Sequence, residues 1–153
     1  MIPGDAPFRL LEGLLLERSG VLLPWDAEAD VLRGIGSPLP REPYLVWRDE
    51  SVFGGLAVNI SLHLAVPGPH TFFLDRIWTM VPDSARAVYP LMVSELEARF
   101  GPPHASEVDE QLSEPEDYPW VQWRWQDVRL SLGIQERFGE SMAFSIRRDR
   151  ASG

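Results

Sequence analysis

The clearest pattern of hydrophobic and polar positions predicts one long helix, over Asp83–Phe100. Its apolar side chains recur at intervals of three or four residues, which places them on one side of a helix. They are Ala85, Tyr89, Met92, Leu96 and Phe100. Asp83 is a suitable N-cap, and Gly101-Pro102-Pro103 is a suitable stop. Because Pro90 lies inside the segment, we expect it to kink the helix or to mark its true start.

The N-terminal third predicts two shorter helices with a strand between them. Asp5–Arg18 and Asp26–Ile35 both space apolar residues by three or four positions, and each is followed by a glycine that can end a helix. Val21–Leu23 is predicted as a short strand that ends at Pro24.

Alternation of apolar and polar residues predicts strands in the rest of the first half. The longest alternating run is Val58–Val66. Before it we expect a strand over Tyr44–Arg48, then a turn over Asp49–Ser51, with a bend at Gly54-Gly55. After it, Thr71–Val81 is predicted to return as a further strand.

The C-terminal part alternates in three consecutive runs, which predicts an antiparallel meander with one solvated face. The first run covers residues 121–126, and we place a turn at Gln126-Asp127. The second covers 128–135 and is followed by a turn at Phe138-Gly139-Glu140. The third covers 142–147.

Together these elements predict a single α+β domain over residues 1–153, with an antiparallel sheet packed on the Asp83–Phe100 helix and on smaller helices. Asp26–Ile35 also ends in a Gly-x-Pro stop, at Gly36-Ser37-Pro38, and strands follow both helices. We therefore expect a tandem β-α-β-β duplication with repeats over 21–66 and 71–148.

Charge and composition narrow the chemistry. The chain has 14 basic and 23 acidic residues, a formal net charge of −9. It has no cysteine, and every basic residue is arginine, so thiolate, disulfide and Schiff-base chemistry have no residue to use. An acidic surface disfavours nucleic acid and favours a basic protein partner.

Hydropathy predicts a soluble, cytoplasmic protein. The N-terminal apolar run lacks a preceding basic segment and is interrupted by Glu12, unlike a signal peptide. No stretch reaches the roughly 18 apolar residues that a membrane-spanning helix needs.

No catalytic, phosphate-binding or dinucleotide motif occurs in the sequence. His63 and His70 are interpreted as polar surface histidines. His104 and the carboxylates after it could chelate a divalent ion, but the loop lacks the glycine and ligand spacing of a calcium hand. We assign no metal and no cofactor, and we expect a mobile acidic loop over His104–Tyr118.

Six tryptophans are unusual in a chain of this length. We expect Trp78, Trp123 and Trp125 in the core. The other three lie nearer turns and loop junctions, where a partly exposed indole would indicate binding. Exposed tryptophan and arginine are typical of interface hot spots. The candidate partner-binding residues combine such positions with the acidic loop: Trp47, Arg48, Trp120, Glu107, Asp109, Glu110, Glu114, Glu116 and Asp117.

The order of helix, Gly-x-Pro stop and antiparallel strands, at Asp26–Pro38 and again at Asp83–Pro103, resembles the tandem helix-on-sheet repeats of beta-lactamase inhibitory proteins. It is also similar to small acidic immunity proteins of bacterial toxin systems. This resemblance implies a bacterial protein that binds and occludes another protein. The tryptophan and arginine spacing matches no motif of these families, so no functional residue is carried over.

Two classes of function follow. The first is a protein-binding module, most concretely an immunity-type inhibitor whose acidic residues meet a basic partner. The alternative is a small-ligand binder or carboxylate-based enzyme with a pocket between the long helix and the sheet, and with Asp75 or Glu136 near its rim. No catalytic residue is assigned, and a homo-oligomer formed through an exposed sheet edge is a third interpretation.

Overall fold

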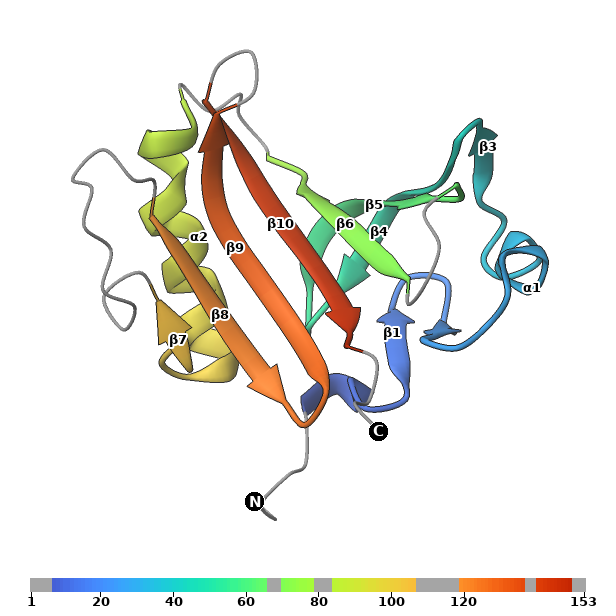
Figure 1. The fold of residues 1–153 in the computed structure, drawn as a ribbon, viewed down its shortest axis with the longest axis horizontal. Coiled ribbons are helices and arrows are strands. Elements are labelled where there is room, and N and C mark those ends of the chain that lie inside the picture. Colours follow the sequence, from blue (N-terminus) through green and yellow to red (C-terminus); the bar gives the residue numbers. More distant parts are fainter. Residues whose placement is uncertain (1–6, 66–69, 79–83, 107–118, 137–139, 150–153) are drawn as a thin grey trace.

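The computed structural model describes residues 7–65, 70–78, 84–106, 119–136 and 140–149 (Figure 1). In chain order the elements are η1 (Pro7–Arg9), β1 (Gly13–Leu16), β2 (Val21–Pro24), α1 (Ala29–Arg33), β3 (Leu39–Arg41), β4 (Tyr44–Val52), β5 (Leu56–His63), β6 (Thr71–Arg76), α2 (Ala85–Phe100), β7 (Ala105–Ser106), β8 (Trp120–Trp125), β9 (Val128–Glu136) and β10 (Glu140–Arg148). The fold is α+β, as the hydrophobic pattern predicts.

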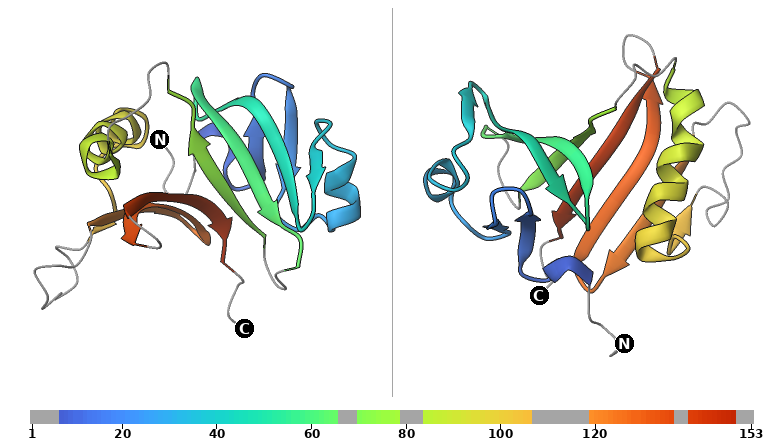
Figure 2. Two further views of the ribbon diagram at one scale, coloured as in Figure 1. Left: turned by 90° about the horizontal axis from the view of Figure 1, so that it is seen from above. Right: turned by 180° about the vertical axis from the view of Figure 1, so that it is seen from behind.

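Eight strands form one antiparallel sheet, in the order β3-β4-β5-β6-β10-β9-β8-β7, and β1 pairs with β2 in a separate hairpin. The sheet consists of two four-stranded meanders, β3–β6 and β7–β10, which join where β6 pairs with β10. Figure 2 shows the two meanders at an angle to one another, so the sheet bends at this joint.

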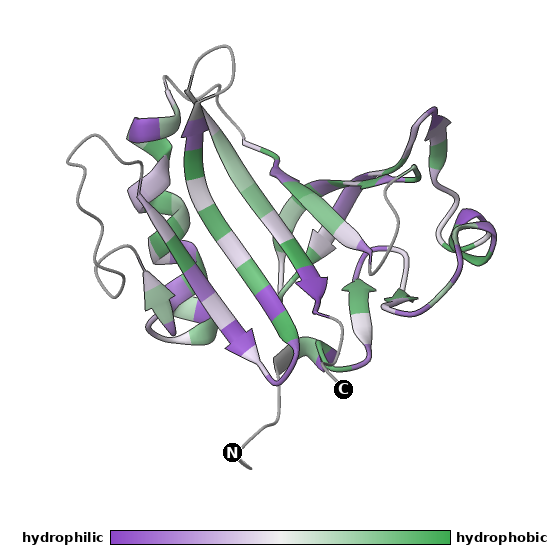
Figure 3. Cartoon of the chain, in the orientation of Figure 1, coloured by the Kyte–Doolittle hydropathy of each residue, from purple (hydrophilic) through white to green (hydrophobic). Residues whose placement is uncertain are grey.

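The C-terminal meander is confirmed. β8 and β9 are joined at Gln126-Asp127, and β9 is followed in the sheet by β10. Figure 3 shows the alternation of hydropathy along β9, whose buried residues are Val128, Leu130, Leu132 and Ile134. Two residues of the remaining predicted turn, Phe138 and Gly139, lie outside the described residues, and the third, Glu140, is the first residue of β10.

The long helix is confirmed with small changes at its start. α2 runs from Ala85 through Pro90 to Phe100, so the proline does not mark the first residue of the helix. Asp83 lies outside the described residues. The N-cap is Ser84, whose hydroxyl accepts a hydrogen bond from the Ala87 amide at 3.1 Å. Val88, Met92 and Leu96 are buried, and Gly101 ends the helix with a positive φ of 78°.

The predicted helix over Asp5–Arg18 is wrong, because the described part of this segment contains only the short turn η1 and the strand β1. Leu14 and Leu16 are buried as alternate residues of a strand, and a run of leucines carries no period that separates strand from helix. Gly13 allows the hairpin to close. A Cβ there would lie 2.3 Å from the carbonyl oxygen of Leu23 on β2.

Other predicted boundaries shift in the first half. The helix expected over Asp26–Ile35 is reduced to α1, and β2 confirms the short strand before it. The turn predicted over Asp49–Ser51 is wrong, because β4 continues to Val52 through a register shift between Trp47 and Glu50. The chain instead turns over residues 53–55, where all three residues have positive φ.

The two later strands of this half are shorter than predicted. β5 begins at Leu56 and ends at His63, and β6 ends at Arg76. The rest of each predicted run reaches residues 66 and 79–81, which lie outside the described residues.

One face of the eight-stranded sheet carries the core. Phe72 of β6 packs beside Trp25, which follows β2, with ring centroids 5.9 Å apart. α2 lies against β9 and β10 on the same face (Figure 2). We call the opposite face the outer face. It carries the alternate residues of the same strands, among them Ser61, Phe73, Asp75, Gln122, Arg129, Ser131 and Ser145.

Candidate functional site

The joint between the two meanders is short and opens at one end. β6 and β10 pair only through Thr71, Phe72 and Phe73, opposite Arg147, Ile146 and Ser145. β6 continues to Arg76 and β10 starts at Glu140, without further pairing between them. The two strands therefore diverge, and they leave space in the middle of the sheet.

A hollow of about 270 Å³ lies on the outer face at this divergence. Its lining combines aromatic, hydroxyl, amide and carboxylate side chains: Ser61, Phe73, Leu74, Asp75, Gln135, Met142, Ala143, Phe144 and Ser145. Three of the lining residues come from β6 and four from β10. The hollow is thus formed by the joint of the two meanders and belongs to neither meander alone.

Phe73 is the most unusual residue of the hollow. Its side chain is 47% exposed in the middle of the sheet. Its register partners on both neighbouring strands are serines, Ser61 on β5 and Ser145 on β10. These small side chains do not cover the ring, so an aromatic face is left open to a partner.

Asp75 supplies the charge of the hollow. Its register partner is Asn59 on β5, and it is exposed. It lies two positions from Phe73 on β6, so both side chains point to the outer face. Among the described residues, no ion pair or hydrogen bond occupies the Asp75 carboxylate. A carboxylate beside an aromatic ring is a suitable site for a cationic group.

A much smaller cavity lies on the helix side of the same divergence. It has about 50 Å³ and is lined by Leu74, Asp75, Arg76, Trp78, Val88, Met92, Met142 and Phe144. This volume holds a few water molecules, whereas ligand pockets usually enclose roughly 300–1,000 Å³. The pocket predicted between helix and sheet is therefore nearly filled, with Asp75 on its lining; the side chain of Glu136 lies outside the described residues.

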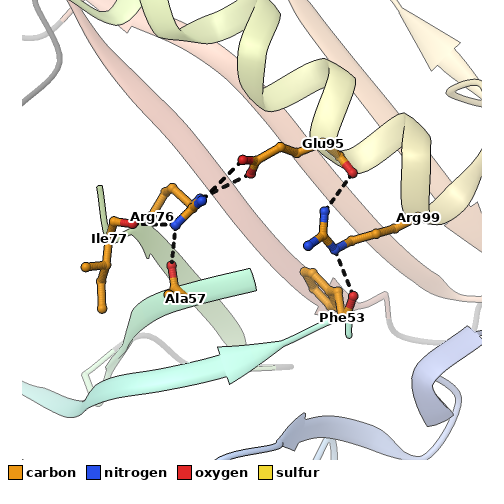
Figure 4. A network of polar contacts seen from close by, with 6 residues as sticks. All are labelled: Phe53, Ala57, Arg76, Ile77, Glu95 and Arg99. Atoms are coloured by element: carbon orange, nitrogen blue, oxygen red, sulfur yellow. Dashed lines mark hydrogen bonds and ion pairs between the residues drawn. The ribbon is translucent and has the colours of Figure 1, made fainter. Parts of the chain in front are cut away.

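Arg76, the last residue of β6, connects this strand to α2. Its guanidinium donates to both oxygens of Glu95 on α2, at 3.1 and 3.2 Å (Figure 4). The same group donates to the carbonyl oxygens of Ala57 and Ile77. A neighbouring arginine, Arg99, donates to the Phe53 carbonyl at 2.9 Å. These bonds join α2 to the first meander on the helix side of the sheet.

Two carboxylates come close together at the β4–β5 turn, but both are satisfied. Glu17 accepts hydrogen bonds from the amides of Gly54 and Gly55, at 2.7 and 2.9 Å, and from the Ser51 hydroxyl at 2.7 Å. Glu50 is 6% exposed and accepts a hydrogen bond from the Ser19 hydroxyl. Because these bonds hold a turn of positive-φ residues, we interpret the pair as structural.

The predicted partner-binding residues do not come together. Trp47 is 1% exposed, so its assignment to a partner-binding surface is wrong; its Nε1 donates to the Ile35 carbonyl at 2.7 Å. Trp25 is likewise buried. Arg48 is exposed on β4 and Trp120 is partly exposed on β8, with β5, β6, β10 and β9 between these two strands. The acidic candidates lie outside the described residues: Glu107, Asp109, Glu110, Glu114, Glu116 and Asp117.

The tryptophans expected in the core divide by burial. Trp123 is fully buried, whereas Trp78 and Trp125 are partly buried and pack against the core cluster. The two tryptophans placed near turns are buried because an indole N–H can reach a carbonyl that a turn or helix end leaves open, as Trp47 and Trp25 do.

The three histidines lie in different surroundings. His63 lies on the outer face against Tyr44, with ring centroids 4.8 Å apart. His70 is half-buried, with Nε2 2.6 Å from the Ala27 carbonyl oxygen, so the expectation of a plain surface residue is wrong. His104 is exposed, and its Nδ1 accepts the Arg124 amide at 2.7 Å. Among the described residues, no group of three or more His, Cys, Asp or Glu side chains could hold a metal ion.

Phe73 was not among the sequence-predicted candidates, although one signal was available. In Thr71–Arg76 the apolar positions of the alternation are Phe72 and Leu74, so Phe73 is an aromatic residue at a polar position. An aromatic side chain at a solvated position of a strand is a candidate anchor for a partner. The hollow itself had no such signal, since it depends on where β10 diverges from β6.

Comparison of the chain with protein-family models, with curated proteins and with solved structures finds no match. Within the described part of the chain, no helix is long and apolar enough to cross a membrane.

Proposed function

We propose that this protein is a protein-binding module, and that it recognises its partner through the hollow around Phe73 on the outer face. The observation that carries this proposal is the exposure of Phe73, 47% in the middle of an eight-stranded sheet, beside the Asp75 carboxylate, which no described residue pairs with. Single exposed apolar residues are common on protein surfaces. Here the residue is aromatic, lies at a concave joint and has polar groups around it, which is the composition of an interface centre.

The occupant we propose is a basic side chain of the partner. The Asp75 carboxylate would accept its hydrogen bonds, and the ring of Phe73 would lie against the cation. Ser61, Ser145 and Gln135 line the same hollow and supply further hydrogen-bonding groups. A formal net charge of −9 would draw a basic surface toward the molecule.

In its most concrete form the module is an acidic, cytoplasmic immunity-type inhibitor that blocks its partner by covering a basic functional surface. This form is supported by the net charge and by the sequence resemblance to small acidic immunity proteins. The mechanism needs no chemical step, because a covered active site is inaccessible to its substrate.

The test is a binding measurement with matched variants. The wild-type chain is used to isolate a partner from its native host, and affinities are then measured with the purified partner. Phe73→Ala and Asp75→Asn should each weaken binding by roughly 10- to 100-fold, the range of an interface hot spot. Leu91→Ala and Asp30→Asn are the controls, because Leu91 is exposed on α2 and Asp30 is exposed on α1.

Two outcomes would count against this proposal. If every partner isolated binds Phe73→Ala and Asp75→Asn as tightly as the wild type, the hollow is not the recognition site. If no protein partner is recovered and light scattering shows a dimer that Phe73→Ala dissolves, the outer face binds a second copy of this chain instead.

The volume of the hollow favours one alternative, a small ligand with an amine group. At about 270 Å³ it approaches the lower limit of ligand pockets, and Asp75 would be the counter-ion. Titration with free arginine and with agmatine, followed by chemical shifts of β6 and β10 amides, separates the two functions. Saturation at micromolar concentration would favour the ligand, whereas no saturation would favour the protein partner.

A further inference from the structure

Three arginines form a row across the outer face of the second meander. Arg124 on β8 is the register partner of Arg129 on β9, and Arg129 is also the register partner of Arg147 on β10. Directly opposite residues on neighbouring strands have Cβ atoms about 4.5–5.5 Å apart and point to the same face. Figure 3 shows hydrophilic segments at these ends of β8, β9 and β10.

Among the described residues, the three arginines of this row have one carboxylate partner, Asp149. Asp149 is within 3.3 Å of Arg129 and 2.8 Å of Arg147. Arg124 makes no ion pair with any described residue, and its guanidinium reaches only the Gln122 side-chain oxygen, at 3.5 Å. Like charges directly opposite each other destabilise a sheet. Burial first, and then the charge of Arg147, lower the pKa of Arg129 from its ordinary value, with Asp149 acting in the opposite direction.

Two other arginines have close carboxylate partners among the described residues. The next residue after the row, Arg148, has Asp127 at 2.8 Å and Asp26 at 2.9 Å. Arg76 has both oxygens of Glu95. In a chain with 23 acidic and 14 basic residues, a row of three arginines with one carboxylate partner among the described residues is a local excess of positive charge in that part of the structure.

We infer that Arg124, Arg129 and Arg147 form an anion-binding row that takes the carboxylates of an acidic segment of the partner protein. Guanidinium groups match carboxylates with two parallel hydrogen bonds, and a row across three strands presents several such groups side by side. A long polyanion such as nucleic acid would be repelled by the net charge of −9, whereas a short acidic segment adds little repulsion.

The row extends the recognition surface of the proposed function, and it rests on that function only for the nature of the partner. On β10, Ser145 lines the hollow and Arg147 is the next residue on the same face. A partner would therefore place a basic side chain in the hollow and acidic side chains on the row. This arrangement selects a partner with both charges in matching positions.

The first measurement uses a fluorescent oligoglutamate peptide as the probe, with the full chain at low ionic strength. The wild type should bind it, and Arg124→Gln should weaken binding by about 10-fold or more, the effect of losing a charge-assisted hydrogen bond. Binding should disappear near 1 M salt, where the Debye length is about 3 Å. Arg41→Gln is the matched control, because Arg41 is exposed on the far edge strand β3 and should leave binding unchanged.

The second measurement is displacement of the bound peptide by inorganic phosphate and by free glutamate. If phosphate displaces the peptide at lower concentration than free glutamate does, the row is a phosphate site and the carboxylate assignment is overturned. Absence of peptide binding, or equal binding by Arg124→Gln and the wild type, would overturn the proposal entirely. Asp75→Asn should not weaken peptide binding, so failure of the row and failure of the hollow are seen separately.

A stability measurement separates binding from a structural role. If the row exists for binding, Arg124→Gln relieves repulsion and should raise the melting temperature at low salt, while Arg41→Gln should not. A melting temperature that falls in Arg124→Gln would show that the row stabilises the sheet, and the proposal would be rejected.

Discussion

The two meanders share a plan but differ in what covers them. In each, a helix and a Gly-x-Pro segment lead into a short outer strand and then three longer strands. Counted inward from either edge of the sheet, the strands follow the same order. In each, a tryptophan of the second strand bonds a carbonyl at the end of the helix: Trp47 to Ile35 at 2.7 Å, and Trp123 to Gly101 at 2.9 Å.

The difference lies in the helices. α2 has 16 residues and covers its meander, whereas α1 has 5 residues, and the β1–β2 hairpin with Trp25 covers the first meander. A curved sheet of this kind needs an apolar cover, and either a helix or a hairpin can provide one. The tandem duplication stays a prediction, and the strand order places β6 with the first unit, so its repeats would be 29–76 and 85–148 instead of 21–66 and 71–148.

The largest expected effect tests whether the two tryptophans are equivalent. Trp47 and Trp123 are 1% and 0% exposed, so replacing either by alanine leaves a cavity and an unpaired carbonyl. Each substitution should lower the free energy of unfolding by about 3–5 kcal/mol, measured by urea denaturation. Trp125→Ala, at a partly buried position, should cost less. A loss below about 1 kcal/mol at one of the two sites would mean that the shared bond does not reflect a shared role.

Substitution of Arg76 tests the contact between α2 and the first meander. Arg76→Leu removes the two hydrogen bonds to Glu95 and leaves this carboxylate of α2 without its ion-pair partner. Since both side chains are less than one-third exposed, we expect a loss of about 2 kcal/mol in unfolding free energy. A double-mutant cycle with Glu95→Gln measures the coupling. Additive effects would show that this ion pair does not hold α2 to the first meander.

The two glycines that begin the Gly-x-Pro segments predict unequal costs for the same substitution. Gly36 and Gly101 both have positive φ, 72° and 78°. A Cβ at Gly36 would meet the Trp47 ring at 3.2 Å, whereas Gly101 has open space around it. Gly101→Ala should cost about 1 kcal/mol for backbone strain, and Gly36→Ala about 2 kcal/mol, by denaturant unfolding. Equal costs would mean that the Trp47 ring moves aside freely.

The smallest expected effect concerns the helix starts. Ser84 caps α2 with its hydroxyl, whereas Glu28, at the same position of α1, makes no capping bond with its side chain. Ser84→Ala should therefore lower the unfolding free energy by about 1 kcal/mol, and Glu28→Ser should raise it by about 0.5 kcal/mol. Thermal unfolding of both variants measures these changes. An unchanged unfolding free energy in Ser84→Ala would show that the cap does not contribute to the stability of α2.

The elements with the clearest hydrophobic periodicity were the ones that the sequence predicted correctly. The C-terminal meander and α2 have clear periods of two and of three to four, and both are confirmed. The leucine run of β1 has no period, and its helix propensity led to the prediction of a helix. In the structure the segment is a strand, because Gly13 lets the backbone pack closely against Leu23 of β2. The assignment of Trp47 to a partner-binding surface failed because proximity to a turn does not tell which carbonyls the turn leaves open to an indole.

The sequence by itself determined the α+β class, the helix α2 and the inward and outward positions along β5, β8, β9 and β10, because hydrophobic periodicity acts over a few neighbouring residues. The tertiary structure alone decided which strands are neighbours, and therefore that Phe73 lies between two serines and that three arginines stand in one row. Register and strand order depend on contacts between residues far apart in the chain, which no local pattern contains.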